Sequence, residues 1–211
     1  MEIHSAAPAN AKKPGKFQLI AGHPALDLVN TLDWRLRESG PEELLPTFDD
    51  LVRFAEQCGL VGSAQARRLM RHATPNEAAH VVAEAQSMRE AAARIFYAVM
   101  EGNQPPTEAI DELERRSREA GLHRHLGWSG SQLVWEFPDD GLAPELPLWI
   151  LTLQVVELLS SETVRMIRAC GSPDCRWLFV DASKNHTRRW CDMKLCGNRM
   201  KARRFKAQRR G

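Results

Sequence analysis

Four of the five cysteines in this chain lie close together near its C-terminal end. They form two pairs, Cys170 with Cys175 and Cys191 with Cys196; four residues separate the members of each pair, and fifteen residues separate the pairs. Two turns that each present two thiolates are typical of a tetrahedral structural zinc site. Because four thiolates leave no open coordination position, we expect a Zn²⁺ ion that holds the fold together and takes no part in catalysis.

Two disulfides or an iron–sulfur cluster are the alternatives for the same four cysteines. Disulfides require an oxidising compartment, and residues 1–16, which we expect to form a disordered tail, lack the apolar segment of a secretory signal. An iron–sulfur cluster also takes four cysteine ligands. His186 could replace one of the cysteines, whereas the remote Cys58 is expected to be a buried apolar residue.

The net charge of +2 conceals a strongly basic C-terminal segment. Residues 165–211 contain 14 Lys and Arg against 3 Asp, a balance of +11; the other residues contain 15 Lys and Arg against 24 Asp and Glu, a balance of −9. Concentrated positive charge beside a zinc site favours binding of a polyanion such as nucleic acid. A basic tail that only increases solubility is the alternative.

The cations flank the second cysteine pair, and we expect a helix over residues 198–208. Cations on most of the circumference of a helix suit phosphate contacts. Asn198 and Arg199 could also contact base edges, or they could cap the helix and brace the zinc site. Trp190 could stack on a base but more often would pack in such a small module, and Met200 and Phe205 are expected to pack inward. The residues expected to contact nucleic acid are Arg188, Arg189, Asn198, Arg199, Lys201, Arg203 and Arg204.

The preceding part of the chain predicts a mainly helical body with a little sheet. The clearest signal is an apolar stripe at spacings of three and four over residues 76–100, typical of a long helix. Proline, glycine and capping residues mark the ends of the others. The expected helices start near Pro24 and cover 48–58, 64–72, 76–100, 107–120 and 147–159; the expected strands cover 17–20, 122–126, 132–137 and 176–181.

Three polar residues stand out in the first helix of this body. Asp27, Asn30 and Thr31 would share one side of that helix. They could line a pocket for a small-molecule effector. Alternatively, they satisfy backbone groups at a turn or a helix end, as Asp, Asn and Thr commonly do.

The sequence offers no recognised catalytic motif, so we do not expect an enzyme. It contains no apolar run long enough to cross a membrane, so no membrane partner is expected. These features favour a cytoplasmic protein.

Two segments resemble known families. The tetrapeptide Cys196-Gly197-Asn198-Arg199, with the cysteines before it and the basic stretch after it, resembles the CGNR zinc-finger family. The segment GHPALDLVNT, residues 22–31, looks like the opening motif of the ABATE domain, which precedes CGNR fingers in bacterial proteins described as stress-induced transcription regulators. The resemblance implies an α+β protein, with a mainly helical ABATE-like domain over 17–160 and a treble-clef or zinc-ribbon-like finger over 165–211.

The same resemblance implies a function. We expect a bacterial transcription regulator that binds DNA through its zinc finger, while the N-terminal domain senses an effector or forms a homodimer. DNA is favoured over RNA as the partner. An RNA-binding protein and a protein-interaction module built on the same finger are the alternatives.

Overall fold

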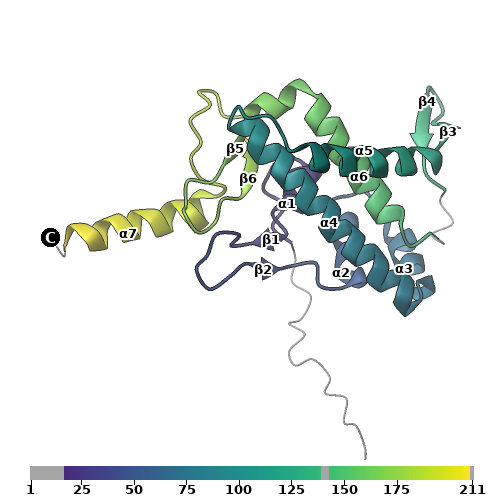
Figure 1. Ribbon diagram of the computed structural model, residues 1–211, viewed down its shortest axis with the longest axis horizontal. Helices are drawn as coiled ribbons and strands as arrows, with labels where there is room; N and C mark the ends of the chain where they lie inside the picture. The colour runs from purple at the N-terminus through teal and green to yellow at the C-terminus, as the bar shows by residue number, and fades with distance from the viewer. Residues whose placement is uncertain (1–16, 139–142, 210–211) are drawn as a thin grey trace, which may run out of the picture.

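The structure is a computed structural model that describes residues 17–138 and 143–209. Within these residues it has a helical body and three separate two-stranded antiparallel sheets (Figure 1). The elements are α1 (Pro24–Val29), β1 (Leu32–Asp33), β2 (Glu42–Glu43), α2 (Phe48–Gln57), α3 (Ser63–His72), α4 (Pro75–Met100), α5 (Thr107–Leu122), β3 (His125–Trp128), β4 (Leu133–Glu136), α6 (Leu146–Ser160), η1 (Glu162–Met166), β5 (Ile167–Ala169), β6 (Leu178–Val180), η2 (Met193–Gly197) and α7 (Asn198–Gln208).

The core of the body lies around α6 and α4. Helix α6 is apolar along most of its length and packs against α1, α2, α4 and α5. Helix α4 begins with a capping box in which Thr74 and Glu77 satisfy each other's backbone N–H groups. Its apolar face includes Met88 and Phe96, which are fully buried. This arrangement confirms the α+β class with a mainly helical body.

Most of the expected helices are present, and several boundaries need correction. Residues 17–20 form no strand; the backbone of Phe17 is instead held by the side chain of Gln57. Helix α3 begins at Ser63 itself, with Gly62 as its N-cap. Helix α5 continues through Gly121 to Leu122, so the following strand starts later than expected. No helix in the described part of the chain is both long and apolar enough to cross a membrane.

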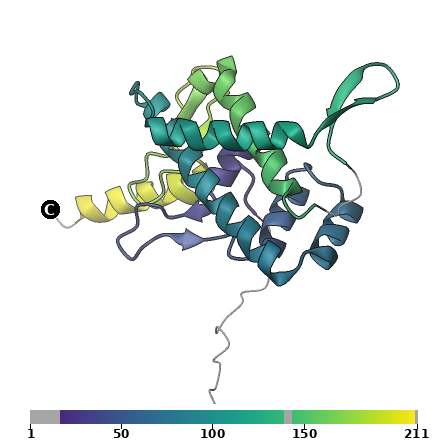
Figure 2. The ribbon, with the colours of Figure 1, turned by 45° about the vertical axis from the view of Figure 1, so that its right-hand side comes forward.

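The C-terminal module joins the body through its small sheet. Ile167 of β5 and Leu178 of β6 are buried in the same core as the helices. A second, smaller core surrounds the cysteines and includes Phe179 and Trp177. Helix α7 leaves this module and extends away from the body (Figures 1 and 2).

Candidate metal centre and nucleic-acid interface

The four clustered cysteines meet at one point. Their Sγ atoms all lie within 4.8 Å of one another, and all four residues are buried. The Sγ atom of Cys191 lies 3.7 Å from that of Cys175 and 3.6 Å from that of Cys196. A tetrahedron with Zn–S bonds of about 2.3 Å has edges of about 3.8 Å, whereas a disulfide requires about 2.05 Å. The donors therefore fit a structural Zn²⁺ ion.

The four thiols influence one another's pKa values. Hydrogen bonds from the neighbouring thiols lower the pKa of Cys170 to about 2. Donation to the Cys170 sulfur raises the pKa of both Cys175 and Cys191. Four neighbouring thiolates repel one another, and a Zn²⁺ ion would supply the positive charge that stabilises them together.

Short turns deliver the ligands to this point. Cys170 follows β5, and its N–H donates to the carbonyl of Trp177 at 2.8 Å. Cys196 lies in η2, a π-helical turn capped by the Asp192 carboxylate and continuous with α7. Trp190 packs beside two glycines; a Cβ atom on Gly171 would lie 3.3 Å from its ring. Trp190 is therefore a packing residue of the module.

Arg188 braces the turn that carries the second cysteine pair. Its guanidinium donates to the carbonyls of Trp190 at 3.0 Å and Ile20 at 3.4 Å, and also to that of Cys191. It also lies over the Phe179 ring, 4.2 Å from the centroid. The structure thus places Arg188 inside the junction between the module and the body.

Asn30 links the body to the zinc module. Its side-chain amide donates to the carbonyl of Leu178 and accepts from the N–H of the same residue, both at 2.9 Å. The N–H of Val180 donates to the carbonyl of Ala21 at 2.8 Å, next to Gly22, whose positive φ of 84° permits the turn. Strand β6 is therefore bonded to residues on both sides of α1, Ala21 before the helix and Asn30 at its C-terminal end.

Asp27 and Thr31 are also engaged in internal hydrogen bonds. Asp27 accepts from the N–H groups of Ile20 and Ala21, both at 3.0 Å. Thr31 donates to the carbonyl of Leu28 and accepts from Arg89. These contacts, like those of Asn30, are the ones expected if the polar residues satisfy backbone groups. Burial raises the pKa of Asp27 to about 6, although its backbone hydrogen bonds oppose the shift.

Two residues that the sequence analysis left without a role complete this junction. The hydroxyl of Tyr97 on α4 donates to the carbonyl of Arg176 at 2.8 Å. Trp34, after β1, packs on the smaller core and lies under Arg199, whose guanidinium is 4.2 Å from the ring centroid. The pairing could not be read from spacing, because Trp34 and Arg199 are far apart in the sequence.

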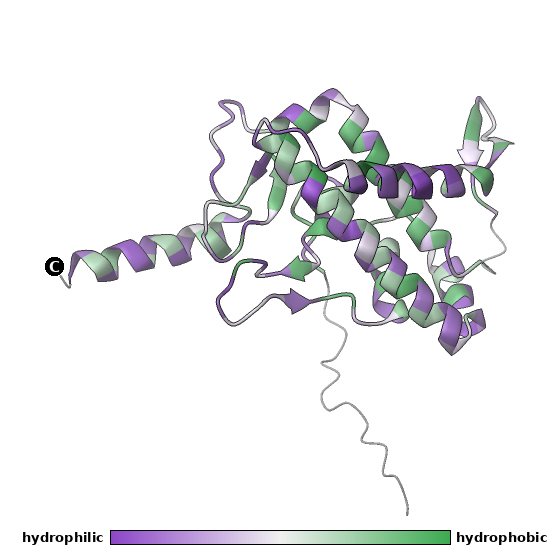
Figure 3. Ribbon diagram, in the orientation of Figure 1, coloured by the Kyte–Doolittle hydropathy of each residue, from purple (hydrophilic) through white to green (hydrophobic). Residues whose placement is uncertain are grey.

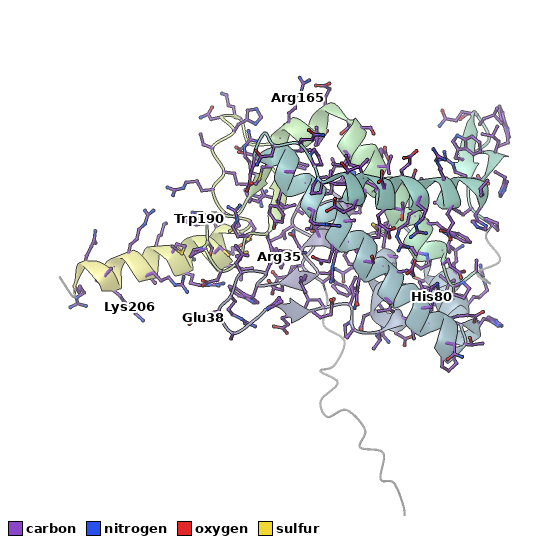
Figure 4. The ribbon with its side chains drawn as sticks, viewed as in Figure 1. Arg35, Glu38, His80, Arg165, Trp190 and Lys206 are labelled. Carbon is purple, nitrogen blue, oxygen red and sulfur yellow. The ribbon has the colours of Figure 1, made fainter. Side chains whose placement is uncertain are left out.

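The surface of α7 is basic and open. The segment Asn198–Arg209 contains six cations and no acidic residue, and no residue of α7 is buried. Figure 3 shows hydrophilic residues recurring along the helix, and Figure 4 shows Lys206 far from the body. Phe205 is 59% exposed, so the expectation that it packs inward is wrong. Beyond its first turns, the helix therefore exposes its side chains around its whole circumference.

The expected nucleic-acid residues on α7 fall into two groups. Arg199 is held over Trp34, and Arg203 forms an ion pair of 2.6 Å with Asp174. These two contacts fix the first turns of α7 to the module. Lys201 and Arg204 are exposed and form no ion pair within residues 17–138 and 143–209. Asn198 is exposed at the start of the helix, and Arg189 is exposed beside Trp190.

Comparison with known families assigns both parts of the chain. Residues 22–162 match the model of ABATE, described as "Putative stress-induced transcription regulator", and residues 166–209 match the CGNR zinc finger. The protein belongs to the ABATE family. A search of curated proteins found no match. Asn30, which bonds to β6 of the CGNR finger, lies within the ABATE match.

Proposed function

We propose that this ABATE protein is a transcription regulator that binds duplex DNA through its CGNR zinc finger. The observation that carries the proposal is α7, an exposed basic helix that leaves the module with no buried residue. An isolated helix of this length is marginal in water. A phosphate-lined partner would stabilise it, because α7 carries five cations and no acidic residue of its own, and one of the five, Arg203, is paired with Asp174.

The dimensions of the helix favour DNA over RNA. The major groove of B-form DNA is about 12 Å wide and admits an α-helix of about 10–12 Å diameter. The major groove of A-form RNA is deep and narrow, so side chains on a helix cannot read it. Since residues 201–209 are exposed and the C-terminal part of α7 extends away from the body (Figure 1), this part of the helix can enter a groove without a clash from the body.

The structure suggests separate roles for the basic residues. Lys201 and Arg204 project freely and are proposed as phosphate contacts. Asn198 and Arg199 lie at the start of α7, where a docked helix would approach base edges. Arg189 and Arg203 would add phosphate contacts beside them. Arg188 is left out of this set because its guanidinium is engaged by backbone carbonyls.

A binding measurement on full-length, zinc-loaded protein tests the proposal. A random duplex DNA pool and a random RNA pool are compared at about 150 mM salt, and retained molecules are sequenced. We expect duplex DNA to be retained with an enriched motif. Retention of RNA alone would replace the DNA assignment with RNA binding, and retention of neither would favour a protein-docking role.

A double substitution, Lys201→Gln/Arg204→Gln, identifies the contacts. Each phosphate contact contributes about 0.9 to the slope of log affinity against log salt, and about fivefold in affinity at 150 mM. We therefore expect the slope to fall by about 1.8 and the affinity to fall about 30-fold. The matched control, Arg67→Gln/Arg71→Gln on α3, removes two exposed cations elsewhere and should change neither. An unchanged slope in the α7 variant would exclude these residues as phosphate contacts.

The family description supports a role in stress, and we further propose that the regulator acts in the bacterial cytoplasm. Comparison of transcripts from a strain lacking the gene and from its parent, before and after stress, tests the role in stress. We expect a set of transcripts to respond only in the parent. Identical responses in the two strains would contradict the role in stress, while leaving DNA binding to be judged on its own measurement.

A further inference from the structure

The β3–β4 hairpin projects from the body at the end opposite α7 (Figures 1 and 2). Its two strands pair over four positions, and residues 129–132 form the tip. The base is anchored on α6: the ring of His123 stacks on that of Trp149 with centroids 3.8 Å apart, and Phe137 lies against the same ring at 6.1 Å. The hairpin is thus held firmly at its base while its strands stand in solvent.

One face of this hairpin is apolar over its four paired positions. Leu126 pairs with Trp135, and Trp128 pairs with Leu133. Because opposite residues of an antiparallel pair share a face, and alternate residues of a strand do too, all four side chains point to the same side. They are 53%, 58%, 66% and 63% exposed, respectively. The opposite face carries His125, Gly127, Val134 and Glu136.

Such a face is unusual in a free monomer. A two-stranded hairpin is marginally stable in water without something packed on its apolar face, and exposed apolar patches on soluble proteins commonly mark interaction sites. Among the protein's six tryptophans, Trp128 and Trp135 are the exposed ones, and both lie here. Within residues 17–138 and 143–209, the guanidinium of Arg124 lies over the Trp135 ring, 4.5 Å from its centroid, yet all four side chains of this face remain more than half exposed.

We propose that this face is a homodimer interface, in which the hairpins of two copies of the chain pack face to face about a twofold axis. A twofold interface needs a surface that complements itself. Four interdigitating Trp and Leu side chains meet that need, and the tip residues Ser129, Gly130, Ser131 and Gln132 bring no like charges together.

The available area supports a second copy as the occupant. A tryptophan side chain has up to about 250 Å² of surface to bury. At their exposed fractions, the two tryptophans leave about 300 Å² of surface accessible to a partner, and the two leucines about 200 Å². Two copies would bury about 1,000 Å² from these side chains, which is the lower bound for a specific interface. We therefore expect a reversible dimer with a Kd on the order of 10 μM.

Sedimentation equilibrium on the full-length, zinc-loaded protein tests the proposal. The wild type should dimerise in the micromolar range, and its tryptophan emission should shift to shorter wavelength as concentration rises, because Trp128 and Trp135 become buried. Trp128→Ser/Trp135→Ser should weaken the dimer at least 100-fold while the circular dichroism spectrum is unchanged. The control Leu36→Ser/Ile110→Ser removes exposed apolar side chains elsewhere, 59% and 42% exposed, and should leave the dimer intact.

A charge-swap pair separates loss of the interface from loss of folding. Leu133→Glu and Leu133→Lys should each be monomeric alone, because two like charges meet across the axis. Mixed together they should form a heterodimer, which two misfolded variants would not do. A wild type that stays monomeric at about 100 μM, ten times the expected Kd, would overturn the proposal. So would a dimer that survives the hairpin substitutions, or mixed variants that fail to associate.

Discussion

Replacing Asn30 by alanine should destabilise the body and the zinc finger together. The side chain is 4% exposed and makes two hydrogen bonds of 2.9 Å to the backbone of Leu178. Alanine would leave a buried N–H and a buried carbonyl without partners. Each costs about 1–3 kcal/mol, so we expect the free energy of unfolding to fall by about 4 kcal/mol, a large share of the roughly 5–15 kcal/mol typical of a domain.

The assay follows unfolding and metal release in the same samples. Urea denaturation monitored by circular dichroism gives the free energy of unfolding, and a chromogenic chelator gives the rate of zinc release. We expect Asn30→Ala to lower the free energy of unfolding and to raise the rate of zinc release, because Leu178 lies on the strand that follows the first cysteine pair. Asn76→Ala, an exposed position on α4, is the control and should change stability by less than about 0.5 kcal/mol.

Two outcomes would refute the reasoning. If Asn30→Ala unfolded with the same free energy as the control, the two hydrogen bonds would carry no net stability. If the variant released zinc faster while the free energy of unfolding of its helices stayed the same, the finger would be an independent unit docked loosely on the body. Only a lower free energy of unfolding together with faster zinc release supports one cooperative unit made of the body and the finger.

Two further predictions concern the metal and pH. Chelation of zinc, or Cys175→Ser, should expose the segment after residue 165 to proteolysis. It should also lower the melting temperature of the helices, because Ile167 and Leu178 belong to the main core. An unchanged digestion pattern would count against a structural metal. Burial raises the pKa of Asp27 from 3.8 to about 6. Between these two pH values Asp27 is deprotonated in the unfolded chain but keeps its proton in the folded chain. The free energy of unfolding therefore falls as the pH rises through this range, by up to about 3 kcal/mol in total. Asp27→Asn keeps the acceptor oxygen without the charge. In denaturation curves its stability relative to the wild type should increase progressively from pH 4 to pH 6. A difference in stability that stays constant over this range would contradict a raised pKa of Asp27.

The metal site and most helices could be predicted because their signals are local. The spacing of the cysteines specifies which sulfurs converge, since a turn of four residues can present two thiolates to one ion. Helix ends were set by neighbouring residues: Thr47 caps α2, and Thr74 with Glu77 caps α4. The helix expected at 198–208 matches α7 at both ends.

The junction between the body and the finger could not be predicted, because it depends on contacts between residues far apart. Asn30 bonds to the backbone of Leu178, 148 positions away, and a backbone partner leaves no trace in the identity of the residue that supplies it. The role of Arg188 was obscured for the same reason: a basic motif beside a zinc ligand predicts phosphate contacts, whereas its actual partners are carbonyl groups. Phe205 was expected to pack inward on general grounds of burial, but α7 has no neighbour to cover it.

If the protein dimerises through the β3–β4 hairpin and binds DNA through α7, the positions of these two elements limit how the dimer can bind DNA. The hairpin and α7 lie at opposite ends of the long axis of the molecule (Figure 1). A dimer formed through the hairpins would therefore place its two α7 helices at its far ends, on either side of both bodies. Dimeric helix-turn-helix proteins read half-sites about one turn, roughly 34 Å, apart because their recognition helices flank the dimer axis. That spacing is out of reach for this arrangement, so a hairpin dimer should bind two well-separated sites or bridge two DNA segments, and its footprint on a short duplex should be that of a single α7.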